Sequence, residues 1–407
     1  MDDPQDLSQL ENFCILPWVQ AHLNQSGAVA PCCKVVNDFA YGNLKESDLQ
    51  AALNSPGAVE MRRELLAGKS PAVCRECKAL DRAGTPSLRT DSLKYHPVAV
   101  VQVLAERSEV VSVKDLTSLD IRFSNLCNFK CRSCGPEYSS SWEASGTGSR
   151  HVQLSKVDHF WPLMDSLIPQ LQHLYIAGGE PSLDSDHFEF LKRLIAKGRK
   201  DIHVAYNSNL SKLSLRNHSW LEDLRQLPSV RLGISVDGAG PQAEVLRKGT
   251  VWTEIVDNIR TLKTEAPHVQ LILNPTVSAM NIFHLPDAIR NWIATGLLTC
   301  DMDLQFNILF KPAYLSLNIL NPKERELVNQ RFASLRLWLQ AEVSSDLAHK
   351  LLPQIDFLLQ SFTEELHSDL RKQFRYVTFA LDRKREESFV KHFPEHFEML
   401  YVEPLNE

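Results

Sequence analysis

Apolar and polar positions follow two different rhythms along this chain, and the rhythm changes between residues 95 and 118. Up to residue 95, proline and glycine interrupt every short apolar stretch, and only 48–66 carries a partial apolar stripe that favours one or two helices. A small segment with few regular elements has a weak core and typically needs a metal or a cluster to hold it together. We therefore predict a small N-terminal domain over 1–95 and a connector, which contains a Val-rich run, over 96–117.

From residue 118, short apolar runs alternate with amphipathic stretches. Strand-like runs lie at 118–124, 171–177, 201–207, 230–236, 269–277 and 304–310, and helical patterns lie at 157–170, 186–197, 214–226, 251–264 and 285–294. This alternation indicates β-α units and a mostly parallel sheet, and right-handed crossovers coil six such units into a partial barrel. We predict an α/β fold with a partial (β/α)6 barrel over 118–320 and a helical C-terminal region over 321–407, with helices at 323–342, 347–361 and 363–388.

The composition is that of a soluble globular protein, with 43% hydrophobic and 23% charged residues. A net charge of −6 leaves no dominant basic surface, which argues against a protein that mainly grips nucleic acid. No apolar run approaches the ~20 residues that a membrane span requires, and the acidic N-terminus lacks the pattern of a signal peptide. We therefore expect a cytoplasmic protein with no membrane or nucleic-acid partner.

Eight of the nine cysteines lie in the first third of the chain. The cytosol keeps thiols reduced, so disulfides are not expected. Scattered core cysteines would not crowd in this way, and we interpret the crowded ones as metal or cluster ligands. Cys300 stands alone in the sequence and is interpreted as a core residue.

Cys127, Cys131 and Cys134 follow the first predicted barrel strand with the spacing C-x3-C-x2-C. Three thiolates on one tight loop bind three irons of a 4Fe–4S cluster, and the fourth iron is left open for a ligand. The ends of barrel strands are also where such folds place their chemistry. A zinc site is the alternative, with His151 or His159 as the fourth ligand, although neither lies at a usual spacing.

In this context the sequence resembles the radical S-adenosylmethionine (radical SAM) superfamily over most of residues 118–310. In that superfamily the amino and carboxylate groups of the cofactor's methionine chelate the open iron. The segment from Ala177 to Pro181 resembles the GGE motif that meets the methionyl amino group. Glycines let the backbone approach a ligand, and Glu180 offers an acceptor to an ammonium group.

Three further segments resemble cofactor-binding loops of the superfamily. They are 206–209, near the ribose, 234–238, which lines the same pocket, and 246–249, where an arginine pairs with the cofactor carboxylate. Ser133 departs from the pattern, because many members have an aromatic residue there beside the adenine, and Phe129 is the nearby aromatic that offers a partial substitute. By this resemblance the cofactor-binding residues are Gly178, Gly179, Glu180, Asn209, Ser235, Asp237 and Arg247.

The N-terminal cysteines resemble the first half of SPASM/twitch auxiliary-cluster domains. Cys14 and Cys32 flank Gly27 in a C-x12-G-x4-C pattern, and Cys74 and Cys77 supply a C-x2-C partner. Four thiolates from a hairpin-like segment and a later knuckle complete one auxiliary cluster, for which 4Fe–4S is expected. A zinc ribbon fits the same spacing from the ligands alone. Cys33 is a fifth thiol; because neighbours in an extended segment point in different directions, we assign Cys32 as the ligand and treat Cys33 as spare or as the alternative ligand.

The resemblance implies an enzyme that reductively cleaves S-adenosylmethionine to a 5′-deoxyadenosyl radical and abstracts hydrogen from a substrate. It also implies a low-potential electron donor of the flavodoxin or ferredoxin type. Members with auxiliary domains often modify peptides or proteins, so that substrate class is our leading hypothesis, by analogy. The alternatives are a small-molecule substrate, such as a sugar, nucleoside or cofactor precursor, and a zinc-stabilised binding scaffold without catalysis.

Overall fold

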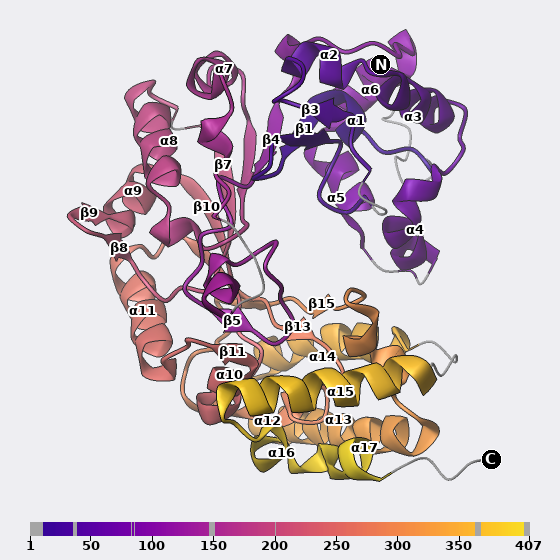
Figure 1. The fold of residues 1–407 in the computed structure, drawn as a ribbon, viewed down its shortest axis with the longest axis vertical. Helices are drawn as coiled ribbons and strands as arrows, with labels where there is room; N and C mark the ends of the chain where they lie inside the picture. The colour runs from indigo at the N-terminus through magenta and orange to yellow at the C-terminus, as the bar shows by residue number, and fades with distance from the viewer. Residues whose placement is uncertain are drawn as a thin grey trace. The chain divides into compact units, whose positions relative to one another are not determined.

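The computed structural model describes residues 11–35, 39–82, 84, 86–145, 151–199, 201–362 and 368–402 (Figure 1). The chain divides into two compact units, and each is described by itself. The first unit comprises residues 1–126, 150–206 and 215–230. The second unit comprises residues 127–149, 207–214 and 231–407.

The sheet of the first unit runs in the order β7-β6-β4-β1-β2-β3. Neighbouring strands are parallel from β7 to β1, and β2 pairs antiparallel with both β1 and β3. The strand β1 comes from the N-terminal segment, so this segment extends the parallel sheet, which the sequence did not predict. The bounds are β1 (Gln20–Leu23), β2 (Ala28–Ala30), β3 (Gly42–Asn43), β4 (Ser118–Ile121), β6 (His173–Ile176) and β7 (His203–Ser208).

The N-terminal segment is more helical than its prolines and glycines predict, and the Val-rich run of the expected connector forms helix α6. Pro56 and Pro97 occupy the first turns of α3 and α6, where a missing N–H costs nothing. Residues that interrupt a pattern therefore begin helices here. The helices are α1 (Leu16–Val19), α2 (Leu49–Leu53), α3 (Pro56–Leu66), α4 (Arg75–Arg82), α5 (Leu88–Tyr95), α6 (Pro97–Glu106), α7 (Phe160–Leu167), α8 (Ser185–Ala196) and α9 (Trp220–Gln226).

The second unit contains the parallel strands β10, β12 and β14 together with most of the C-terminal helices. Two short pairs accompany them: β5 with β11, antiparallel, and β13 with β15, parallel. Their bounds are β5 (Lys130–Cys131), β10 (Ser229–Ile234), β11 (Arg247–Lys248), β12 (Gln270–Leu273), β13 (Thr276–Val277), β14 (Asp303–Leu304) and β15 (Asn307–Ile308). The helices are α10 (Gly240–Leu246), α11 (Trp252–Glu265), α12 (Leu285–Ala294), α13 (Pro322–Glu342), α14 (Ser345–Gln360), α15 (Ser368–Arg385), α16 (Phe389–His392) and α17 (Phe397–Tyr401).

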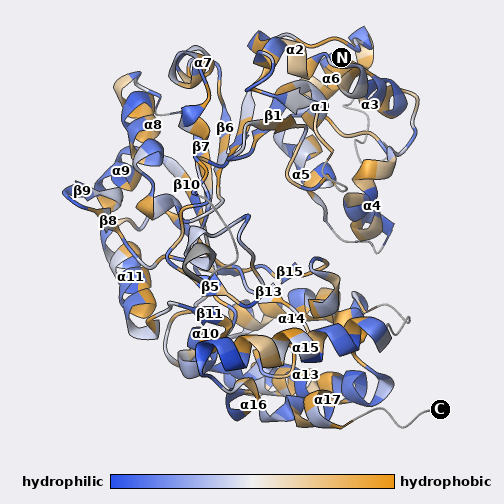
Figure 2. Cartoon of the chain, in the orientation of Figure 1, coloured by the Kyte–Doolittle hydropathy of each residue, from blue (hydrophilic) through white to orange (hydrophobic). Residues whose placement is uncertain are grey.

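The α/β class is confirmed, because β4, β6, β7, β10, β12 and β14 follow one another along the chain with helices between them. Helices such as α8 and α11 carry hydrophobic residues on one side and hydrophilic residues on the other (Figure 2). The expected run 269–277 is divided into β12 and β13, with Pro275, which cannot donate to a ladder, between them. The first residues of the third predicted C-terminal helix, 363–367, lie outside the described residues. Within the described ranges, no helix is long and apolar enough to cross a membrane.

Candidate functional site: two sets of cysteines and their surroundings

The loop after β4 brings Cys127, Cys131 and Cys134 together in the second unit. Cys131 is buried and lies on β5, and the backbone N–H of Cys134 donates to the Cys131 carbonyl at 3.2 Å. The thiol of Cys134 has a raised pKa, first because it is buried and then because Cys131 and Cys127 lie close to it. The three predicted ligands therefore form one cluster of neighbouring thiols.

Arg247 connects this loop to Asp237. The short strand β11 pairs Arg247 with Cys131, and the Arg247 Nη1 lies 3.9 Å from the Cys131 Sγ. The Nε and Nη2 atoms donate to the Asp237 carboxylate at 2.8 and 3.1 Å, and the Thr276 N–H donates to the same carboxylate at 2.8 Å. Burial alone would lower the pKa of Arg247, but the charge of Asp237 outweighs it and the pKa is raised. The guanidinium is therefore a fixed positive charge beside Cys131.

Asn209 approaches the same loop from the end of β7. Its Nδ2 lies 3.9 Å from the Cys127 Sγ and 3.0 Å from the Asn128 Oδ1, while its Oδ1 accepts the Ser211 N–H at 2.9 Å. Asn128 in turn donates to the Ser211 hydroxyl at 3.0 Å. Sequence reasoning missed Asn128 and Ser211, although Asn128 stands next to a predicted ligand. The network fixes the start of the cysteine loop.

The backbone of Ser235 donates to the Ser208 carbonyl at 2.8 Å, which ties the ends of β7 and β10 within this unit. Phe129, the proposed substitute for the missing aromatic residue, is 1% exposed. Its ring lies against Gly249, where an added Cβ would be 2.9 Å from the Phe129 Cδ1. Phe129 therefore serves the packing of the loop. Cys300 is exposed, so its interpretation as a core residue is wrong.

The Gly178-Gly179-Glu180 segment follows β6 in the first unit. Gly178 and Gly179 have φ angles of 84° and 55°, which other residues rarely adopt. A Cβ on Gly179 would stand 2.4 Å from the carbonyl oxygen of Leu126, the residue before Cys127, and the Glu180 N–H donates to this oxygen at 2.6 Å. The two glycines therefore allow the turn to pack directly against Leu126 of the same unit.

Glu180 is 1% exposed, and its carboxylate accepts hydrogen bonds from the Ser182 N–H at 3.0 Å and the Ser182 hydroxyl at 2.8 Å. The turn is supported from α8 by His187, whose ring atoms lie 2.9 Å from the Pro181 carbonyl and 3.0 Å from the Tyr206 hydroxyl. Burial lowers the pKa of His187 to about 3, so the ring is neutral. The acidic residue of the motif is thus held in a preformed hydrogen-bonded turn.

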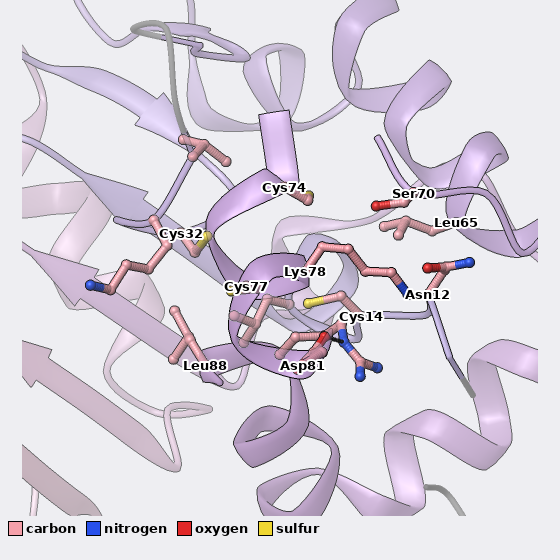
Figure 3. A pocket seen from close by; sticks show the side chains of 14 residues that line it. Asn12, Cys14, Cys32, Leu65, Ser70, Cys74, Cys77, Lys78, Asp81 and Leu88 are labelled. Carbon is pink, nitrogen blue, oxygen red and sulfur yellow. Dashed lines mark hydrogen bonds and ion pairs between the residues drawn. The ribbon is translucent and has the colours of Figure 1, made fainter. Parts of the chain in front are cut away.

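The N-terminal cysteines line a single pocket in the first unit. Cys14 precedes α1, Cys32 follows β2, Cys74 ends the short 3-10 helix Ala72–Cys74 just before α4, and Cys77 lies in the first turn of α4 (Figure 3). The pocket contains about 460 Å³ of empty space, including its open mouth. The C-x12-G-x4-C pattern is the β1–β2 hairpin, so the expected hairpin is confirmed. Basic side chains also line this pocket: Lys34, Lys78 and Arg89.

Burial raises the pKa of Cys14 to about 11 and that of Cys74 to about 12. Neighbouring cysteines raise these pKa values further: Cys77 acts on Cys14, and both Cys14 and Cys77 act on Cys74. Among the described residues, no three His, Cys, Asp or Glu side chains are arranged to hold a single metal ion. Four thiols from three chain segments suit an iron–sulfur cluster, whose irons each take one thiolate.

Cys33 is not among the residues that line the pocket. Its thiol donates a hydrogen bond to the Asp120 carboxylate on β4. Cys33 as a whole residue is exposed. Its pKa is nevertheless raised to about 12, first because protein atoms surround the thiol and then because the negative charge of Asp120 disfavours the thiolate. The structure therefore separates two adjacent cysteines, with Cys32 at the pocket and Cys33 at a carboxylate.

Asp120 belongs to a polar row that sequence reasoning missed. The pairing of β1, β4 and β6 places His22, Asp120 and Tyr175 side by side on one face of the sheet. The His22 Nδ1 lies 3.1 Å from Asp120, Arg122 pairs with Asp120, and the Arg122 guanidinium stacks 4.8 Å from the Tyr175 ring centroid. A buried parallel sheet is normally apolar on both faces, so a charged row points to function. The other face is apolar, with Leu23, Ile121 and Ile176 fully buried.

The fold and the two cysteine sets define an iron–sulfur protein of the α/β class. A family model of the radical SAM superfamily matches residues 121–278, and a model of the SPASM iron–sulfur cluster-binding domain matches residues 14–78. Residues 121–278 thus carry a radical SAM domain, a domain of enzymes, and residues 14–78 carry a SPASM-type iron–sulfur domain.

Among curated proteins, the chain is similar to the GTP 3′,8-cyclase of Campylobacter lari, with 29% identity over 119 residues, or 29% of this chain and 34% of that protein. It is 24% identical to the GTP 3′,8-cyclase of Sulfurimonas denitrificans over 212 residues, or 52% of this chain and 61% of that protein. The chain therefore spans less than two thirds of the length of these relatives. The solved structure of native anSMEcpe with bound AdoMet is 18% identical, with a TM-score of 0.40 and coverage of 55% of this chain and 62% of that one.

Proposed function

We propose that this protein is a radical SAM enzyme in which Cys127, Cys131 and Cys134 bind a 4Fe–4S cluster with one open iron. The observation that carries the proposal is the convergence of three neighbouring thiols on one loop, with Arg247 and Asn209 each 3.9 Å from a cysteine sulfur. When bound, the cluster and S-adenosylmethionine supply the 5′-deoxyadenosyl radical that takes hydrogen from the substrate.

The residues of the second unit proposed to bind the cofactor are Asn209, Ser235, Asp237 and Arg247. Because the Arg247 fork is occupied by Asp237, we propose that Asp237 orients Arg247 and that Arg247 places positive charge beside Cys131. In the first unit, Gly178 and Gly179 supply the backbone turn, and Glu180 supplies the carboxylate for an ammonium group, as the resemblance implies.

Cys14, Cys32, Cys74 and Cys77 are proposed to bind one auxiliary 4Fe–4S cluster. Support comes from their shared pocket, whose walls carry three basic residues, Lys34, Lys78 and Arg89, against one carboxylate, Asp81, since a cluster with four thiolates is anionic. A zinc ion bound by the same four thiols remains the alternative to be tested. The electron donor is proposed to be a low-potential protein of the flavodoxin or ferredoxin type.

Two substrate classes are proposed. The auxiliary domain favours a peptide or protein, by analogy with members that carry such domains. The curated relatives are named GTP 3′,8-cyclase, which favours a small molecule such as a nucleotide. The polar row that includes His22, Asp120 and Arg122 supports a polar substrate in either case, because it offers hydrogen-bonding groups together with the charges of Asp120 and Arg122.

The test is anaerobic reconstitution followed by iron and sulfide analysis, electron paramagnetic resonance (EPR) spectroscopy and assay of 5′-deoxyadenosine. Wild-type protein should hold about eight irons, as expected for two clusters with four irons each. Cys131→Ala should lose about four of them and all cleavage of S-adenosylmethionine. Cys300→Ala is the matched control, because Cys300 is exposed and belongs to neither set. Colourless protein that binds zinc and forms no 5′-deoxyadenosine would contradict the proposal.

The substrate class is tested separately, by offering GTP and a peptide library to the reconstituted enzyme with deuterium-labelled substrates. Transfer of deuterium into 5′-deoxyadenosine identifies the class from which hydrogen is taken. Transfer from the peptides alone would contradict the small-molecule class, and transfer from GTP alone would contradict the peptide class.

A further inference from the structure

The end of helix α15 and the start of α16 contact the cysteine loop within the second unit; residues 382–389 are called the tail segment below. Arg132 stands inside the loop, between Cys131 and Cys134, and is 3% exposed. Its Nη2 pairs with Asp382 and lies 3.1 Å from the Glu387 Oε2, across separations of 250 and 255 residues. The cysteine loop is therefore joined by a buried ion pair to the far end of the chain.

A second arginine makes the reverse contact. Arg385, in the tail segment, donates from Nη2 to the Lys130 carbonyl at 2.6 Å, and its guanidinium lies 4.9 Å from the Trp142 ring centroid. The first interaction holds Lys130, which directly precedes Cys131, and the second holds Trp142, eight residues after Cys134. The loop and the tail segment are thus joined by two arginines, Arg132 from the loop and Arg385 from the tail segment.

The carboxylates of the tail segment are themselves fixed. The Asp382 Oδ2 accepts the Phe389 N–H at 2.8 Å, and Glu387 also pairs with Lys248 on β11. The Arg132 guanidinium lies 5.2 Å from the Phe389 ring centroid. Because β11 also carries Arg247, the tail segment supports both strands of the β5–β11 pair on which Cys131 lies.

A charge buried as deeply as that of Arg132 is costly unless it is paired and hydrogen-bonded. Three cysteines on a loop do not need such a charge to bind irons, and the position lies between two of the proposed ligands. We propose that the tail segment is a positioning element for the cluster: Asp382 and Glu387 fix Arg132 and so hold Cys131 and Cys134 in the arrangement that the cluster needs. This inference rests on the proposed function only for the identity of the cluster.

The test uses the full-length double variant Asp382→Asn/Glu387→Gln, which removes the two charges without deleting a side chain. The matched control is Glu324→Gln, which breaks another buried pair of the same unit, in which Arg371 lies 2.6 Å from each Glu324 oxygen. Hydrogen–deuterium exchange of residues 127–139 is measured in the protein as purified, and iron content and the EPR signal of the reduced cluster, with and without S-adenosylmethionine, are measured after reconstitution.

We expect the double variant to raise exchange in the loop about tenfold, since a charged hydrogen bond is worth a factor of that order. It should also lose iron from the cluster of this loop and alter the EPR change that S-adenosylmethionine produces. Glu324→Gln should leave the exchange of the loop, the iron content and the EPR signal unchanged, even if it lowers the melting temperature as much as the double variant does. Arg132→Lys keeps the charge without the fork, so its exchange should be intermediate.

Unchanged exchange and an unchanged EPR signal in the double variant would overturn the inference. Equal effects of the double variant and Glu324→Gln would also overturn it, because they would indicate a general loss of stability. A wild-type protein without iron would contradict the proposed function instead, and the exchange data would still decide whether the tail segment holds the loop.

Discussion

Arg247 grips the carboxylate of Asp237 with two hydrogen bonds, at 2.8 and 3.1 Å, and presents its remaining nitrogen to Cys131 at 3.9 Å. A residue that the sequence assigned to the cofactor carboxylate is therefore held by the protein's own carboxylate. The same guanidinium faces the cysteine loop, so it belongs to the electrostatic surroundings of a proposed ligand.

Replacing Asp237 with Asn should destabilise the protein by about 3–5 kcal/mol, because the buried Arg247 charge loses its partner. Replacing Arg247 with Gln should destabilise the protein to a similar extent, because the Asp237 carboxylate is 4% exposed and loses its partner. It should also raise the KM for S-adenosylmethionine about tenfold or more, through loss of the positive charge beside Cys131. Denaturant unfolding and initial-rate assays measure the two effects. An unfolding free energy unchanged by Asp237→Asn would contradict the importance of the pair.

Gly179→Ala should abolish cluster binding, since its Cβ would stand 2.4 Å from the Leu126 carbonyl and the φ of 55° already disfavours a side chain. Gly198→Ala is the matched control, because Gly198 has a φ of 70° and no atom within 4 Å of an added Cβ. The control should cost only the backbone strain, about 1 kcal/mol. Iron content after reconstitution separates the two variants, and equal iron in both would refute the close-approach argument.

Cys32→Ala and Cys33→Ala should behave differently although the residues are adjacent. Cys32 lines the pocket with three other thiols, whereas Cys33 bonds to Asp120. We expect Cys32→Ala to lose about four irons and Cys33→Ala to keep all of them, as a single auxiliary cluster requires. Iron analysis and EPR spectroscopy measure this. Loss of iron in Cys33→Ala but not in Cys32→Ala would show that Cys33, and not Cys32, is the ligand.

His187 should make the protein sensitive to acid. Its pKa of about 3 in the folded state lies below its ordinary value of 6.5, so the unfolded chain binds more protons between these values. Stability is therefore complete above pH 6.5 and falls as the pH decreases towards 3, by up to about 1.4 kcal/mol per pH unit. His187→Gln should flatten the dependence of unfolding free energy on pH, while His349→Gln, at an exposed position, should leave the slope unchanged.

The sequence predicted the α/β class and the order of strands and helices, because hydrophobic periodicity reports burial directly. Of the predicted cofactor-binding residues, Asn209 and Arg247 lie 3.9 Å from the sulfur atoms of Cys127 and Cys131, and the roles of the whole set stay a prediction. The sequence did not predict the Arg247–Asp237 pair, the Arg132–Asp382 pair or the row that includes Asp120. The Arg132–Asp382 pair and the row join segments distant in sequence, and the Arg247–Asp237 pair joins residues ten positions apart in different elements. Hydrophobic periodicity carries no information about such partners.

The helices α4, α5 and α6 were also missed, for a local reason. Prolines and glycines mark ends of elements as well as interruptions, and in a segment of short helices the two cannot be distinguished by composition. Cys300 was misplaced because its immediate neighbours, Thr299 and Asp301, are polar, and the thiol lies with them at the exposed surface.

The parallel pairing of β1 with β4 limits where this chain can be truncated. Gln20–Leu23 shares a hydrogen-bond ladder with Ser118–Ile121, the strand that leads into the cysteine loop. Cutting the chain after residue 95 would strip β4 of this neighbour and leave a bare edge, which invites self-association. The cysteine-rich N-terminal segment is therefore a structural part of the sheet. We expect gain or loss of its proposed cluster to change the stability of the β1–β4 ladder.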